Sequence, residues 1–128
     1  AYYSVSKFAL EGYAEALAYE IAPFGVRVTL VQPGNFSTGF SDARRDVVLA
    51  PDDIYAAAMT KAVKRMESDE RHGARPHVCA TTVGKVLASS RPPLRVTTGR
   101  AFERVGPVAK RVLPFRLFAA AARSSLGL

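Results

Sequence analysis

Tyr3 and Lys7 are the two residues whose types and spacing could perform proton chemistry. They stand four positions apart in a segment that reads as a helix, and residues four apart share one helix face. A lysine ammonium beside a phenol favours the phenolate, which suits a general acid or base working near neutral pH. Many helices carry a tyrosine and a lysine at this spacing by chance, so the pair needs support from its surroundings.

The elements after this pair follow the order helix, turn, strand, turn. Residues 4–22 predict a helix that is apolar on much of its circumference and therefore buried on more than one side. Residues 26–31 read Val-Arg-Val-Thr-Leu-Val, a short β-branched run typical of a central parallel strand. Pro33-Gly34 follows the carboxyl end of that strand, where open parallel sheets bind ligands. The same dipeptide also suits an ordinary turn.

Two motifs in this stretch resemble the short-chain dehydrogenase/reductase family. Tyr-Ser-Val-Ser-Lys at residues 3–7 matches the family's Y-x-x-x-K active-site helix, and Pro33-Gly34-Asn35-Phe36-Ser37-Thr38 matches its P-G-x-x-x-T element. The later elements are compatible with the second half of a doubly wound sheet. The resemblance therefore implies an α/β fold: the C-terminal half of a Rossmann-like doubly wound parallel-sheet domain, beginning at the Y-x-x-x-K motif and followed by a short helical tail.

The resemblance also implies an activity, that of an NAD(P)-dependent oxidoreductase interconverting an alcohol and a ketone or aldehyde. Tyr3 would be catalytic by exchanging a proton with the substrate oxygen. Lys7 would be catalytic by favouring the phenolate and binding the nicotinamide ribose. Backbone near Phe36 and the hydroxyl of Thr38 would meet the carboxamide or the phosphates of NAD or NADP. The implied cofactor-binding set is Tyr3, Lys7, Pro33, Gly34, Phe36 and Thr38.

The substrate implied is bulky and apolar, because Ser-Lys-Phe-Ala-Leu-Glu-Gly followed by a Pro-Phe-Gly turn resembles the branch acting on steroid- or retinoid-like alcohols. The sequence contains no G-x-G-x-x-G or related glycine cluster for a pyrophosphate. We therefore expect a fragment that is inactive alone. The alternative is a non-catalytic remnant that acts as an interaction module or a peripheral membrane-binding module.

Composition bounds the class of protein. A chain of 128 residues, 48% of them hydrophobic, suits one modest globular domain. It has no apolar run of the roughly 18 residues that span a bilayer, and no secretory signal is visible. The lone Cys79 reads as a packing residue and suits a reducing compartment, which predicts a cytoplasmic protein. The two histidines, Cys79 and scattered acids have no metal-ligand spacing, so no metal is expected.

Five further segments are expected before residue 99. Residues 39–51 predict a mobile loop, which in the family forms part of a substrate lid. Asp52 or Asp53 would cap a helix running to about residue 68, and a charged loop with an exposed His72 would follow. Pro76 would begin another helix, and Leu94–Thr98 reads as a last strand.

Residues 100–128 differ from residues 1–99, which are the expected part of the NAD(P)-binding domain. The tail carries six of the basic residues against the single acid Glu103, a net +5 of the chain's +7. Pro107 and Pro114 would divide it into short helices, the second of them amphipathic and basic. That pattern suits packing on the domain first and contact with an anionic membrane second. The chain has no nucleic-acid-binding motif, so no nucleic-acid partner is expected.

The first helix offers a second interaction surface. Gly12 and several alanines would let another helix approach closely, which suits a homo-oligomer interface in the family. Burial within one subunit explains the same composition. The partners expected are therefore a small-molecule alcohol or carbonyl substrate and another copy of the chain.

Overall fold

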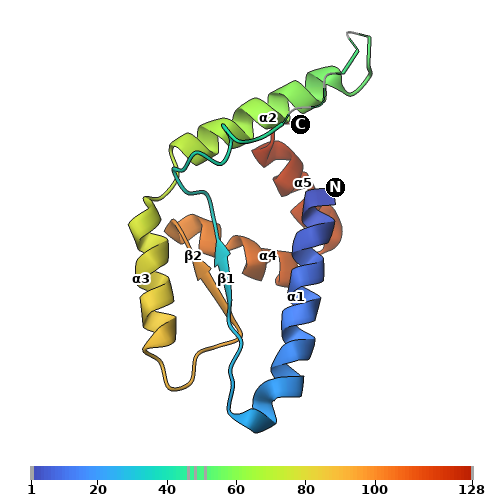
Figure 1. The fold of residues 1–128 in the computed structure, drawn as a ribbon. Coiled ribbons are helices and arrows are strands. Elements are labelled where there is room, and N and C mark those ends of the chain that lie inside the picture. Colours follow the sequence, from blue (N-terminus) through green and yellow to red (C-terminus); the bar gives the residue numbers. More distant parts are fainter. Residues whose placement is uncertain (1, 46, 48, 51, 128) are drawn as a thin grey trace. The chain divides into compact units, whose positions relative to one another are not determined.

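The computed structural model of the chain describes residues 2–45, 47, 49–50 and 52–127. It forms two compact units, residues 1–33 with 77–98 and residues 34–76 with 99–128. The elements, drawn in Figure 1, are α1 (Tyr2–Ile21), a 3-10 helix (Ala22–Phe24), β1 (Leu30–Pro33), α2 (Ala56–Arg71), α3 (Pro76–Leu87), β2 (Arg95–Thr98), a second 3-10 helix (Ala101–Arg104), α4 (Gly106–Val112) and α5 (Phe115–Ser125). The predicted division into residues 1–99 and a tail stays a prediction. The two compact units do not follow that boundary, because each of them combines two separate segments of the chain.

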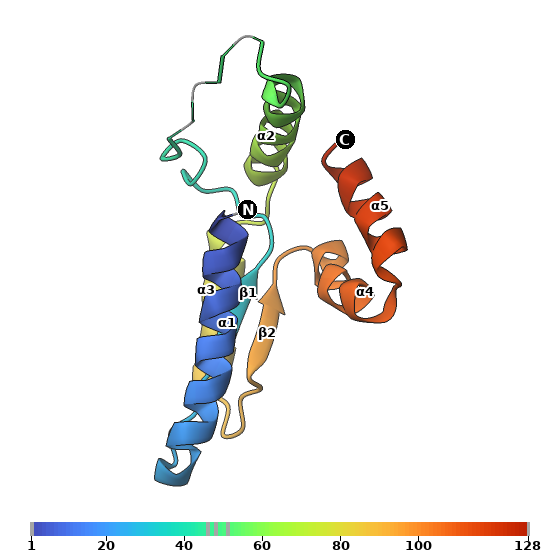
Figure 2. The same ribbon diagram turned by 90° about the vertical axis from the view of Figure 1, so that its right-hand side faces the viewer.

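The first unit is built around a parallel pair of strands. β1 and β2 pair in register from Leu30 opposite Arg95 to Pro33 opposite Thr98. In Figure 1 the pair lies between α1 on one side and α3 on the other, and in the view turned by 90° α1 lies in front of α3 (Figure 2). Parallel strands need a long crossover connection, and the segment containing α2 and α3 supplies it. The predicted α/β class is confirmed, and the arrangement is consistent with part of a Rossmann-like domain.

The predicted strand at residues 26–31 is displaced towards the carboxyl end. β1 begins at Leu30, whose N–H donates to Leu94 O at 2.7 Å. Just before it, the Thr29 hydroxyl donates to Pro93 O at 3.0 Å, so a side chain takes the place of the ladder there. A β-branched run becomes a strand only where a partner runs beside it, and β2 offers four residues.

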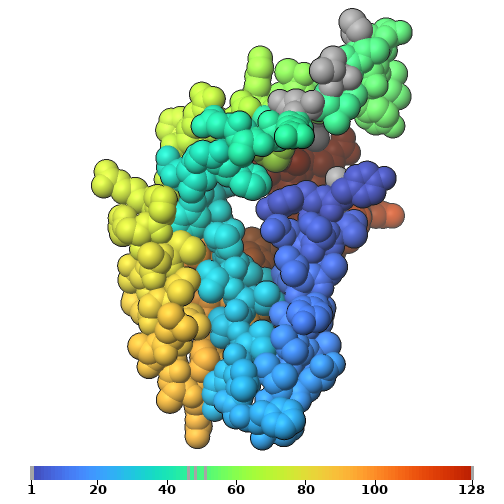
Figure 3. Space-filling model, in the orientation of Figure 1, coloured from blue at the N-terminus to red at the C-terminus, as the bar shows by residue number. Residues whose placement is uncertain are grey.

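The long helix α1 carries most of its apolar side chains at the surface. Among the described residues, Ala14 is the only hydrophobic one that is buried, and Phe8 is 61% exposed. Figure 3 shows α1, in blue, with its side chains along the surface. The prediction that this helix is buried on more than one side is therefore wrong for this chain. Polar contacts to the sheet hold the helix instead: Arg95 bonds to Glu11 and Glu15, and Gln32 donates to Glu11 at 2.7 Å.

The second unit contains α2, α4 and α5. α2 begins at Ala56, later than predicted, and Tyr55 precedes it without a side-chain cap. The carboxylate of Asp53 accepts from Tyr55 N at 2.8 Å and so closes a turn ahead of the helix rather than capping it. The predicted breaks at Pro107 and Pro114 are confirmed, because α4 has its proline in the first turn and α5 starts directly after Pro114.

In the described part of the chain, no helix combines the length and the apolar character that crossing a membrane requires.

Candidate active site

Tyr3 and Lys7 lie in the first turns of α1 and share one face. The Lys7 ammonium lies 5.3 Å from the centroid of the Tyr3 ring, within cation–π range. Tyr3 is 64% exposed, and its carbonyl accepts a hydrogen bond from the Ser6 hydroxyl at 2.8 Å. The helix therefore brings the two predicted catalytic residues together, with the phenol accessible to a substrate.

The exit of β1 is built closely around a carboxylate. Asn35 N donates to Glu103 Oε1 at 3.0 Å, and Arg100 N donates to Glu103 Oε2 at 2.8 Å. Glu103 thereby joins the segment that follows β1 to the segment that follows β2. A Cβ added at Gly34 would lie 2.7 Å from Glu103 Cδ, too close for a side chain. A side chain at position 34 would therefore force Glu103 to shift from its bonds to Asn35 and Arg100.

The next residues are held by backbone contacts. Phe36 forms a parallel bridge with Ala74. Ala74 N donates to Asn35 O at 2.8 Å, and Ser37 N donates to Ala74 O at 2.9 Å. A Cβ at Gly73 would lie 2.6 Å from Asn35 O, so only glycine permits this approach. The P-G-x-x-x-T segment is thus tied to the residues just after α2.

Thr38, the last residue of that motif, bonds to a side chain that the sequence did not single out. The Thr38 hydroxyl donates to Glu70 Oε1 at 2.9 Å. The same carboxylate accepts from Phe40 N at 3.1 Å, from Ser41 N at 3.0 Å and from the Ser41 hydroxyl. We call this set, Thr38, Phe40 and Ser41 around Glu70, the Glu70 cluster.

Hydrogen bonds keep Glu70 ionised although it is only 8% exposed. The bond from the Ser41 hydroxyl holds the pKa of Glu70 below its ordinary value, and burial opposes this effect. The bonds from the Thr38 hydroxyl and from the N–H groups of Ser41 and Phe40 lower it further. A carboxylate with this many donors remains charged without a cation.

A second charged group fixes α1 to the sheet. Arg95 Nε lies 3.1 Å from Glu11 Oε2, and Arg95 Nη2 lies 2.8 Å from Glu15 Oε2. The bond from Arg95, with one from Tyr19, lowers the pKa of Glu15. The carboxylates of Glu15 and then Glu11 raise the pKa of Arg95. Since Glu11 stands one turn after Lys7, this ion-pair network positions the helix that carries the predicted catalytic residues Tyr3 and Lys7.

The predicted site residues fall into two groups. Tyr3, Lys7 and Pro33 belong to the first compact unit, whereas Gly34, Phe36 and Thr38 belong to the second. Sequence reasoning missed Glu70 and Glu103, which hold the second group. A signal existed for Glu103, because it is the single acid of a basic tail.

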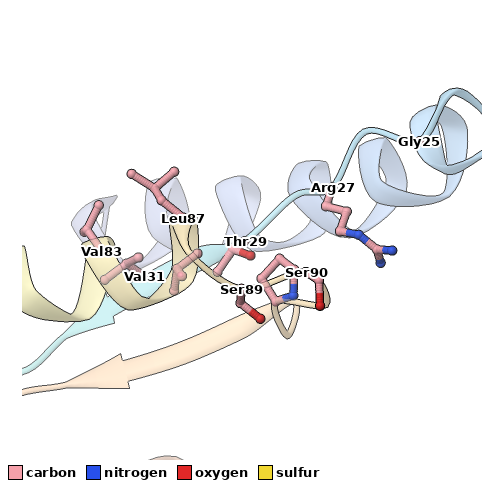
Figure 4. Close-up of a pocket in the computed structure, with 10 residues that line it drawn as sticks. Gly25, Arg27, Thr29, Val31, Val83, Leu87, Ser89 and Ser90 are labelled. Atoms are coloured by element: carbon pink, nitrogen blue, oxygen red, sulfur yellow. The ribbon is translucent and has the colours of Figure 1, made fainter.

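An open hollow of about 480 Å³ lies elsewhere in the first unit (Figure 4). Its wall combines apolar side chains such as Val31, Val83 and Leu87 with polar ones such as Thr29 and Ser89. It lies beside the amino ends of β1 and β2, whereas open parallel sheets bind ligands at the carboxyl ends. Within the first unit, the hollow therefore does not lie at the end of the sheet where a ligand is expected.

Comparison with known proteins supports the reading of the first residues. The family model described as short chain dehydrogenase matches residues 1–48. A 3-ketodihydrosphingosine reductase of Bacteroides thetaiotaomicron is 40% identical over 114 residues, covering 88% of this chain and 42% of that protein. Oxidoreductase BOA17 of Botryotinia fuckeliana is 30% identical over 109 residues, which cover 84% of this chain and 40% of that protein. Retinol dehydrogenase 8 of Bos taurus is 31% identical over 113 residues, which cover 78% of this chain and 34% of that protein.

These similarities and the α/β fold place the chain in the short-chain dehydrogenase/reductase family. The chain spans about two fifths of the length of the first two of these relatives.

Proposed function

We propose that this chain belongs to an NAD(P)-dependent oxidoreductase that interconverts an alcohol and a ketone or aldehyde. The observation that carries the proposal is the Tyr3–Lys7 pair, with the ammonium 5.3 Å from the ring centroid on one helix face. The oxidoreductases to which the chain is similar support it.

In this proposal Tyr3 exchanges the proton and Lys7 assists it. The phenol gives a proton to the carbonyl oxygen during reduction and takes one during oxidation. The ammonium of Lys7 favours the phenolate and donates hydrogen bonds to ribose hydroxyls. A dinucleotide, when bound, would supply the hydride during reduction and accept it during oxidation.

The residues after β1 suit a dinucleotide in part. Thr38 keeps an acceptor lone pair, because its hydroxyl hydrogen is directed to Glu70, and such a lone pair suits an amide N–H. The Asn35 N–H, by contrast, is already bonded to Glu103, and Gly34 is covered by the same side chain. In the proposed site Pro33, Gly34 and Phe36 therefore shape the backbone, and Thr38 supplies the polar contact.

We test this function in the protein produced from the complete reading frame that contains this chain. Tyr3→Phe should lower kcat by about 10²- to 10⁴-fold, because positioned acid–base groups contribute that much. Tyr2→Phe is the matched control, since Tyr2 is adjacent, 92% exposed and not four residues from a lysine. A Tyr3→Phe protein that retains more than about a tenth of the rate would contradict proton transfer by Tyr3.

The proposed substrate is a bulky apolar ketone or alcohol. The names of two relatives, 3-ketodihydrosphingosine reductase and retinol dehydrogenase 8, support this class. A panel of a long-chain 3-keto amine, a retinoid, a steroid and small polar ketones would test it. Turnover of the small polar compounds alone would rule this class out.

A second candidate function is contact with an anionic membrane surface by the tail of an otherwise cytoplasmic protein. The observation that favours it is the exposure of Phe115 and Leu117, at 82% and 60%, on a helix that also carries Arg116 and Arg123. Replacing both apolar residues by serine should abolish co-sedimentation with phosphatidylserine vesicles. Ala120→Ser on the same helix is the control. If the double variant co-sediments with the vesicles as before, membrane contact by these residues is excluded, and packing of the tail on the domain explains its amphipathic pattern.

Self-association through α1 is the last interaction proposed. A Cβ at Gly12 would meet no atom within 4 Å, so this part of the helix is open to a neighbour. Gly12→Gln should therefore weaken a homo-oligomer measured by analytical ultracentrifugation. An unchanged sedimentation coefficient would exclude this face as the interface.

A further inference from the structure

Glu70 is the only charged side chain that is buried among the residues the structure describes. It stands in the last turn of α2, which ends at Arg71. A negative charge there opposes the helix macrodipole, which favours cations at the C-terminal end. The position of Glu70 is therefore not explained by the stability of its own helix.

Among the described residues, the hydrogen bonds of the Glu70 side chain all go to one short turn. The carboxylate accepts four hydrogen-bond donors from Thr38, Phe40 and Ser41, and in the described part of the chain no cation pairs with it. Residues 35–37 are held separately by the backbone bridge between Phe36 and Ala74. The segment after β1 is thus fixed in two places, and Glu70 fixes the place that carries Thr38.

The Glu70 cluster also sets the direction of the hydrogen bonds at Thr38. An ionised carboxylate has no proton to donate, so the hydroxyl hydrogen of Thr38 points to Glu70. The remaining polar contact of Thr38 Oγ1 is a long one, accepted from Phe40 N at 3.3 Å. The oxygen therefore presents an acceptor, and a ligand group that bonds to it must be a donor.

We propose that Glu70 is a positioning residue for the dinucleotide site: its ionised carboxylate holds the turn of residues 38–41 and makes Thr38 a hydrogen-bond acceptor towards the ligand. This inference rests on the proposed function, in which Thr38 contacts the cofactor. Glu70 itself does not touch the reacting atoms in this scheme and acts through Thr38.

The test is a double-mutant cycle on dinucleotide affinity in the protein from the complete reading frame. Glu70→Gln places N–H donors against the donors of the turn and should raise the Kd for NAD(P)H about tenfold, as expected for loss of charge-assisted hydrogen bonds. It should change kcat less than twofold, because Tyr3 and Lys7 are untouched. In a Thr38→Val background, Glu70→Gln should raise the Kd little further, because both variants remove the same interaction between Glu70 and the Thr38 hydroxyl. Asp69→Asn is the matched control, since Asp69 is the adjacent acid and pairs outward with Arg65 at 3.2 Å.

The outcomes separate this inference from the function on which it rests. If Thr38→Val raises the Kd but Glu70→Gln does not, or if the two effects simply add, Glu70 is not acting through Thr38. If Thr38→Val leaves the Kd unchanged, the proposed cofactor contact fails first.

Amide hydrogen exchange on the unaltered protein gives a readout that does not depend on how a variant folds. The amides of Phe40 and Ser41 should exchange at least tenfold more slowly than that of the exposed turn residue Asp42. Equal exchange rates would overturn the proposal that Glu70 holds the turn of residues 38–41.

Discussion

The substitution Arg95→Met tests the ion-pair network that holds α1 against the sheet. It keeps an aliphatic side chain but removes the guanidinium from Glu11, 3.1 Å away, and from Glu15, 2.8 Å away. The three side chains are 33%, 36% and 42% exposed, so water screens both pairs. Because partly exposed pairs contribute roughly 0.2–1 kcal/mol, the variant should lose less than about 2 kcal/mol of unfolding free energy.

The assay is urea unfolding of the full-length protein at 25 °C in 0.1 M and in 1 M NaCl. The Debye length falls from about 10 Å to about 3 Å between these salts, so the difference between Arg95→Met and the unaltered protein should shrink in the second. Arg65→Met is the control, because its pair with Asp69 lies on one exposed helix face and should contribute less than about 0.5 kcal/mol.

The result that would refute this reasoning is a loss of stability that is equally large at both salt concentrations. Arg95 would then act through packing of its side-chain stem, as long cationic side chains can, and not through its charge.

Three further predictions concern stability. Gly34→Ala should cost about 1–3 kcal/mol through its clash with Glu103; Glu103→Gly should relieve much of that cost, and an equal cost in both backgrounds would contradict the clash. The pKa of Glu15 is lowered in the folded chain, so its contribution is complete above its ordinary pKa and is lost as pH falls through the lower folded value; Glu15→Gln should flatten acid unfolding in that range, and an unchanged acid limb would count against the pairing. Thr98→Val should cost about 1 kcal/mol in urea unfolding, because the buried Thr98 hydroxyl lies 2.9 Å from that of Thr82; a neutral substitution would show that this bond contributes nothing.

Local signals accounted for most of the elements. α3 begins at Pro76 as predicted, and Pro114 separates α4 from α5, because proline suits the first turn of a helix and disrupts its interior. The end of α1 also followed from local sequence, since Gly25 adopts a positive φ of 73° directly after the 3-10 helix.

The bounds of β1 depended on a partner distant in the sequence, whereas the start of α2 depended on a local turn. The run at residues 26–31 has the composition of a strand, but only Leu30 and Val31 of it lie opposite β2. Aspartate is a common helix cap, but the Asp53 carboxylate accepts from Tyr55 N and closes a turn before α2. Strand propensity indicates that a segment can form a strand, and tertiary contacts determine which of its residues do so.

The proximity of Tyr3 and Lys7, the proposed catalytic pair, could be predicted from sequence because both residues stand on one helix, where spacing alone determines the shared face. Glu70 is separated from Thr38 by 32 positions, and Glu103 from Asn35 by 68. No helix or strand period connects such residues, so their contacts required the fold.

The parallel pairing of β1 with β2 has a consequence for folding kinetics. Leu30 lies opposite Arg95, 65 positions further along the chain, and the pair has four residues in register. Closing a flexible loop of that length costs about 3.7 kcal/mol by the logarithmic chain-entropy relation, before any contact of the ladder forms. The helices between the strands must therefore shorten the loop first. We expect the two strands to join late, with φ-values near zero for substitutions in β1, and the chain to fold more slowly than its helical content suggests.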